Sequence, residues 1–130
     1  MTQIASSYQH FLTPPGPFAV VTVATLDGLV AIPNQPAQLD TAADWTVLPQ
    51  LIVDQLGIQP VRTVDLVGFG GLPAQYPVFE VMLMLPTFTP IRVEVTAFAN
   101  EPWILLGRNV LNQYKITLDG PLLRLTIVKP

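Results

Sequence analysis

The residues best suited to chemistry lie in segment 38–48, which reads Gln-Leu-Asp-Thr-Ala-Ala-Asp-Trp-Thr-Val-Leu. Asp40 follows an apolar run and is expected to lie at a turn. Thr41 adds a hydroxyl group, and a second carboxylate follows at Asp44. Between them, the small side chains of Ala42 and Ala43 let another chain pass close by. Carboxyl groups at such a turn can take up or release protons, so the segment is a candidate for acid–base chemistry.

Other common catalytic groups are scarce in the chain. It contains no cysteine, so a thiol nucleophile, thiolate metal ligands and disulfides are excluded. The only histidine is His10 and the only serines are Ser6 and Ser7, all in a polar leader. A serine triad needs an ordered base that a third group orients, and one leader is a poor source of that geometry. If the chain is an enzyme, its acid–base groups are carboxylates.

Composition indicates one soluble globular domain with a modest core, since the chain has 130 residues. Half of it is apolar and 12% is charged, which is too little charge for a disordered segment. The apolar runs are too interrupted for a membrane span, and no secretory signal is visible, which favours a cytoplasmic location. The formal net charge is −3 and the six basic residues are scattered singly, so nucleic acid is not an expected partner. So few charges suggest that another subunit covers part of the apolar surface.

The elements that position segment 38–48 are expected to be mostly strands. Runs rich in Val, Ile and Thr, with an apolar–polar alternation that is clearest at 91–98, give this prediction. Strands are predicted at residues 18–25, 29–32, 37–39, 61–67, 76–85, 91–98, 103–106, 115–118 and 122–128. Pro33, Asn34 and Pro36 are expected to interrupt the chain between the second and third of these.

Two short helices complete the expected elements. Pro49 suits the first helical position, residues 50–56 continue the helix, and Gly57 ends it. A second helix is expected to begin after residue 106 and to end near Tyr114.

Three motifs, in this order, resemble those of the retropepsins, the single-domain homodimeric branch of the aspartic proteases. They are the Asp40 loop, the glycine-rich hairpin tip at 68–71, and Ile-Leu-Leu-Gly-Arg-Asn at 104–109. In that family the matching motifs are the catalytic loop, the flap and a helix that begins near Gly-Arg-Asn/Asp. An isolated Leu-Asp-Thr would more often be a strand that ends in a side-chain-capped turn, so the order and spacing carry the resemblance. It implies a mainly β fold, a closed barrel with one or two short helices, assembled as a homodimer.

The resemblance also implies roles for residues of the loop. Each chain supplies one Asp-Thr motif, so two Asp40 side chains would meet on the twofold axis of a homodimer. Two carboxylates a few ångströms apart share one proton, so one can accept a proton from water while the other donates to the substrate carbonyl. Thr41 would hydrogen-bond across the axis. Arg108 would pair with Asp44 and fix the loop, or the two would form an ordinary solvated surface pair.

The hairpin tip would be the flap, a lid that closes over an extended peptide. Gly68, Gly70 and Gly71 would let it bend, and Phe69 would supply an apolar contact; the alternative is an ordinary exposed hairpin. Trp45 would shape a side-chain pocket, or it would belong to the core.

Ala42 departs from the family motif Asp-Thr/Ser-Gly-Ala, because it stands at the glycine position. If φ there is negative, the methyl group merely narrows the cleft; if φ is positive, it adds roughly 1 kcal/mol of strain. The expected function is that of an aspartic endopeptidase that cleaves extended peptides at acid to mildly acid pH, without a metal or cofactor. The alternative is a protease-like dimerisation or peptide-binding module with weak catalysis or none.

The two ends of the chain are expected to serve assembly. Residues 1–17 are interpreted as an N-terminal arm, either loose or extended and paired with a partner, and residues 18–130 as the protease domain. The C-terminal strands alternate polar with apolar residues, which favours an interface-covered ribbon. They are expected to form an intersubunit sheet, together with the leader.

Overall fold

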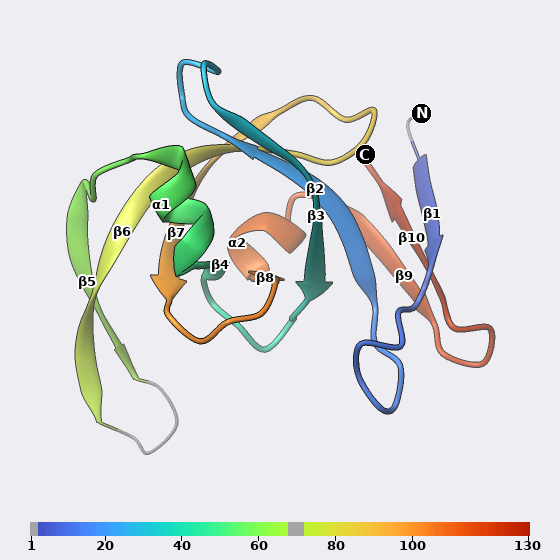
Figure 1. Ribbon diagram of the computed structural model, residues 1–130. Helices are drawn as coiled ribbons and strands as arrows, with labels where there is room; N and C mark the ends of the chain where they lie inside the picture. The colour runs from blue at the N-terminus through green and yellow to red at the C-terminus, as the bar shows by residue number, and fades with distance from the viewer. Residues whose placement is uncertain (1–2, 68–71) are drawn as a thin grey trace.

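The computed structural model describes residues 3–67 and 72–130 and is built mainly of strands (Figure 1). In this part of the chain the elements follow in the order β1 (Gln3–Ser7), β2 (Phe18–Ala24), β3 (Ala31–Leu39), β4 (Thr46–Pro49), α1 (Gln50–Leu56), β5 (Arg62–Val67), β6 (Pro73–Met84), β7 (Ile91–Phe98), β8 (Ile104–Leu106), α2 (Arg108–Leu111), β9 (Lys115–Asp119) and β10 (Arg124–Val128). The mainly β fold with short helices that the sequence predicts is confirmed.

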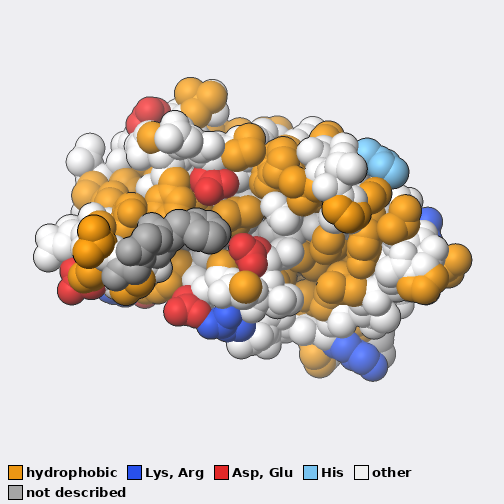
Figure 2. Space-filling model, turned by 90° about the horizontal axis from the view of Figure 1, so that it is seen from below, with side chains coloured by type: hydrophobic (Ala, Val, Ile, Leu, Met, Phe, Trp, Pro, Cys, Tyr) orange, Lys and Arg blue, Asp and Glu red, His pale blue; other side chains and the backbone are white. Residues whose placement is uncertain are grey.

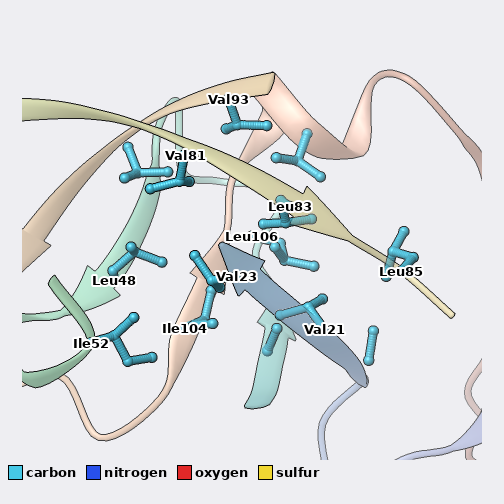
Figure 3. Packing of buried hydrophobic residues seen from close by; sticks show 14 of the residues in the cluster. Val21, Val23, Leu48, Ile52, Val81, Leu83, Leu85, Val93, Ile104 and Leu106 are labelled. Atoms are coloured by element: carbon cyan, nitrogen blue, oxygen red, sulfur yellow. The ribbon is translucent and has the colours of Figure 1, made fainter. Parts of the chain in front are cut away.

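Six strands close into a barrel in the order β2, β3, β8, β4, β7 and β6, because β2 also pairs with β6. β5 extends the sheet beyond β6. Apolar side chains fill the interior, and Leu48, Leu83 and Ile104 are fully buried in it (Figure 3). Burial of each such side chain stabilises the fold by about 1.5–3 kcal/mol. This core fixes the strand ends from which the candidate site emerges.

β3 is longer than the sequence predicts. The sequence predicts a break at Pro33, Asn34 and Pro36, but all three residues lie inside one strand. Asn34 takes a positive φ of 59°, and the pairing with β2 shifts register between Val21 and Val23. Only the last three residues of β3 also pair with β8, so its first part has one neighbouring strand and tolerates prolines. The strand therefore runs without a break to Asp40.

α1 begins one residue later than predicted. Pro49 is the last residue of β4 and caps the helix in an extended conformation, instead of occupying the first helical position. Gly57 ends α1 with a φ of 68°, in the left-handed region that favours glycine, so the predicted helix stop is confirmed.

The termini form a separate three-stranded sheet beside the barrel, in the order β1, β10, β9 (Figure 1). Instead of a loose arm, residues 3–7 form β1, which pairs antiparallel with β10 of the same chain. The predicted C-terminal strands are present. In the turn between them, Asp119 Oδ1 accepts from the Leu122 N–H and the Gly120 carbonyl oxygen accepts from the Leu123 N–H. None of the helices in residues 3–67 and 72–130 has the length and apolar character needed to cross a membrane.

Candidate active site

Asp40 leaves the barrel where two parallel strands end together. β3 pairs with β8 up to Leu39 and Leu106, and the Asp40 N–H then donates to the Leu106 carbonyl oxygen at 3.0 Å. Pro17 accepts a hydrogen bond from the Leu39 N–H at 3.0 Å on the other side. Backbone contacts from two distant segments thus hold the position of Asp40, which is only partly exposed.

The Asp40 side chain shapes its own turn. Its Oδ1 accepts a hydrogen bond from the Ala42 N–H at 3.1 Å, and the Ala43 N–H donates to the Asp40 carbonyl oxygen at 3.2 Å. Within the described residues, no hydrogen bond reaches the second carboxylate oxygen. One oxygen is therefore used for the turn, and the other remains available for a ligand.

Ala42 carries no left-handed strain. Among the described residues other than glycine, a positive φ occurs at Asn34, Thr87 and Leu123, and not at Ala42. Of the two alternatives for this departure from the family motif, the structure therefore supports the one in which the methyl group costs little.

Arg108 ties the turn to the start of α2 through three contacts. Its Nη2 forms an ion pair with Asp44, as the resemblance implies, and its Nη1 donates to the Thr41 carbonyl oxygen at 2.9 Å. Its backbone N–H donates to the Ala43 carbonyl oxygen at 2.8 Å. The ion pair is largely exposed and is worth little by itself, so the two bonds to backbone carbonyls are the more important restraints.

A buried polar network under the loop was not found from the sequence. Thr46 is fully buried, and its Oγ1 donates to Asn109 Oδ1 at 2.8 Å and accepts from the Gly107 N–H at 3.1 Å. Asn109 Oδ1 also accepts from the Thr46 N–H at 3.0 Å, while its Nδ2 donates to the Glu94 carbonyl oxygen at 2.8 Å. A threonine beside the apolar pair Val47-Leu48 was the available signal, because a buried hydroxyl needs partners.

Gly107 lies in close contact with the backbone that follows Asp44. A Cβ built on Gly107 would lie 2.9 Å from the Thr46 nitrogen and would overlap the Trp45 carbonyl group. These are backbone atoms that no rotamer change can move, so any side chain at this position would force the backbone to shift.

β5 and β6 form the stem of the hairpin whose tip is predicted to be a flap, and they pair from Arg62 with Val78 to Val67 with Pro73. Its proposed tip, Gly68, Phe69, Gly70 and Gly71, lies outside the described residues. Trp45 lies beside the stem, with the Arg62 guanidinium 5.6 Å from its ring centre. Trp45 is part-buried, and this contact joins it to the first residue of β5.

Glu101 brings a second carboxylate to the same region, and sequence reasoning missed it. Partial burial, and then the negative charge of Asp40, raise the pKa of Glu101 above its ordinary value. The loops that carry the two residues lie at the same end of the barrel, which is its lower end in Figure 1. Figure 2 shows that face, where acidic side chains gather near the middle among broad apolar areas.

Comparisons with solved structures identify the fold. The chain is similar to a retropepsin-like aspartic protease from Rickettsia conorii, with a TM-score of 0.67 and 11% identity over 97% of this chain and 90% of that one. It is also similar to the EIAV protease complexed with the inhibitor HBY-793, with a TM-score of 0.50 and 22% identity over 75% of this chain and 86% of that one. No family model matches the chain, and no curated protein matches it by sequence. The fold is retropepsin-like, as the sequence predicts.

Gly107→Ala is expected to destabilise the protein by about 1–3 kcal/mol, because the added methyl group overlaps fixed backbone atoms. Gly120→Ala is the matched control, since a Cβ there meets nothing within 4 Å. Urea unfolding followed by circular dichroism measures both. Equal unfolding midpoints for the two variants would contradict the close approach.

Arg108→Lys is expected to lower stability by about 0.5–1.5 kcal/mol, since an ammonium group cannot hold the Thr41 carbonyl and Asp44 with one planar fork. Arg124→Lys, exposed on β10, is the control. The same unfolding assay applies, and an unchanged midpoint for Arg108→Lys would show that the fork does not brace the loop.

Glu101→Gln is expected to raise the melting temperature at about pH 7 and to leave it unchanged at about pH 3. A raised pKa means that the folded state favours protonated Glu101. Below the unfolded pKa, Glu101 is protonated in both states and does not affect the free energy of unfolding. As pH rises through the folded pKa, the ionised side chain lowers that free energy. Asp54→Asn, exposed on α1, controls for loss of one negative charge. A pH-independent difference in melting temperature would contradict this electrostatic account.

Proposed function

We propose that two copies of this chain form an aspartic endopeptidase whose catalytic pair consists of Asp40 from each copy. The observation that carries the proposal is the part-buried Asp40 at a turn braced by Arg108, with one carboxylate oxygen free of protein hydrogen bonds among the described residues. The retropepsin-like fold supports it, since proteins with that fold include aspartic proteases. One chain offers one such loop, so the second carboxylate must come from a second copy.

The reaction needs no group beyond the two carboxyls and water. The ionised Asp40 takes a proton from water as its oxygen attacks the scissile carbonyl carbon, and the protonated Asp40 donates to the carbonyl oxygen. Collapse of the tetrahedral intermediate breaks the C–N bond, and the leaving nitrogen takes a proton from the pair. Because one proton must be shared, activity is bell-shaped in pH with an optimum on the acid side.

The terminal sheet is the proposed dimer contact. The exposed leucines Leu118, Leu122 and Leu123 lie at or near the β9–β10 turn. That turn is at the same end of the molecule as the Asp40 loop in Figure 1. A partner copy that covered these leucines would bring its own Asp40 toward the first one, and Thr41 would hydrogen-bond across the axis.

The substrate is proposed to lie extended between the Asp40 loops and the β5–β6 hairpin. Alternate side chains of an extended peptide point to opposite sides, so they would enter separate pockets. Trp45 would line one of these pockets, with Ala42 on the cleft wall. The residues at 68–71 would close over the peptide as a flap.

Asp40→Asn is expected to reduce cleavage of a denatured protein substrate by at least about 100-fold, since asparagine cannot exchange the proton. Asp54→Asn, on the exposed side of α1, should retain wild-type activity. Product peptides are counted by mass spectrometry from about pH 3 to pH 8, with and without pepstatin.

Undiminished cleavage by Asp40→Asn would contradict the catalytic assignment. No cleavage by the wild-type protein at any pH would favour the second candidate, a protease-like dimerisation or peptide-binding module. Ala42, which stands where the family motif has glycine, is the feature that favours this candidate.

A further inference from the structure

The loop between β7 and β8 carries a carboxylate, Glu101, that no cation of the described residues neutralises. Glu80 forms an ion pair with Arg92, Glu94 with Arg62, and Asp44 with Arg108. In residues 3–67 and 72–130, the Glu101 side chain has neither an ion pair nor a hydrogen bond, although it is partly buried. Partial desolvation without a partner is unfavourable for an ionised carboxylate, which suggests that the partner comes from a ligand.

Glu101 lines a hollow of about 360 Å³ at the base of the hairpin stem. Tyr76 from β6 and Phe98 at the end of β7 form one part of the hollow, with ring centres 5.0 Å apart. Asn100 adds a polar side chain, and none of the lining residues is basic. The hollow therefore combines two aromatic rings with one unpaired negative charge.

The loop that carries Glu101 is tied to the strand that leads to Asp40. Trp103 Nε1, two residues after Glu101, donates to Gln38 Oε1 at 3.0 Å, and Gln38 is two residues before Asp40. The Trp103 ring also packs edge-on against Phe18, with ring centres 5.0 Å apart. These contacts fix the loop against β3, so the position of Glu101 relative to Asp40 is set by the fold.

We propose that Glu101 selects substrates that place an arginine or lysine side chain in the hollow it shares with Tyr76 and Phe98. This inference rests on the proposed function, because the ligand is the peptide to be cleaved. A cation gains from a carboxylate and from the faces of aromatic rings, while the aliphatic stem of Arg or Lys packs on the same rings. An acidic side chain would meet the negative charge of Glu101 in the hollow and is excluded by repulsion. An apolar side chain would bury Glu101 further without compensation.

The test uses two pools of fluorescein-labelled decapeptides with an apolar background. One pool carries a single arginine that is scanned through every position, and the other carries citrulline, a neutral isostere, at the same positions. For the best arginine position, kcat/KM of the wild-type protein is expected to exceed that of the citrulline peptide by about tenfold or more, the size expected of a charge-assisted contact. In Glu101→Gln this ratio falls toward one while cleavage of the citrulline peptide is retained. Asp54→Asn, which loses the same charge on α1, should keep the wild-type ratio.

A binding measurement separates this inference from the proposed catalysis. Fluorescence anisotropy of the same peptides is recorded with Asp40→Asn alone and with Asp40→Asn combined with Glu101→Gln. One outcome separates the two proposals: the wild-type protein cleaves no peptide, yet Asp40→Asn binds arginine peptides about tenfold more tightly than citrulline peptides, and adding Glu101→Gln removes this difference. In that case the inference holds and the peptidase proposal fails. Cleavage with equal arginine and citrulline rates, or an arginine preference that survives Glu101→Gln, would overturn the inference and leave the peptidase proposal intact. Equal binding without cleavage would overturn both.

Discussion

The geometry around Asp40 depends on one close approach of two backbone segments, between Gly107 and the Trp45–Thr46 peptide. No side chain fits between them, and buried Thr46 joins them by accepting from the Gly107 N–H and donating to Asn109. Arg108 lies between Gly107 and Asn109 in the sequence. The fixed position of these two neighbours therefore also orients the Arg108 guanidinium toward the Asp40 loop. The polar groups involved are satisfied within the protein, so the network resists distortion when one side of the loop faces solvent.

This arrangement explains why the barrel matters for the site. β3 and β8 run parallel and end together, which places Asp40 and the Gly107 segment at one end of the sheet. β4 pairs with β8 on its other side at Val47 and Leu105, so the chain after the Asp40 turn returns into the same core. The loop is therefore tied at both ends by buried strands, and Asp40 itself can remain partly exposed.

Local patterns predicted local structure well. The alternation of apolar and polar residues along β7 correctly predicted its bounds, Ile91–Phe98. Gly57 correctly predicted where α1 ends. The break predicted at the prolines of β3 was wrong. A proline lacks the N–H that strand pairing uses, and only the arrangement of neighbouring strands shows whether that N–H is needed. The three motifs predicted the fold and the pairing of Arg108 with Asp44.

What the sequence did not predict depends on contacts between distant segments. Thr46 and Asn109 are 63 residues apart, and nothing in the local pattern of either one indicates the other. Glu101 looks like an ordinary loop acid in the sequence, and only the fold places it in a hollow with Tyr76 and Phe98. Pairing of β1 with β10 likewise joins opposite ends of the chain.

The central claim is that each chain holds half of a catalytic pair, and subunit mixing tests it most directly. Wild-type protein is allowed to exchange subunits with an equal amount of Asp40→Asn protein, and peptide cleavage is compared with that of the wild type alone at the same total concentration. If each site needs two Asp40 side chains and mixing is random, about one quarter of the activity remains, since only that share of dimers has both. If about one half remains, each chain works independently and the account is contradicted.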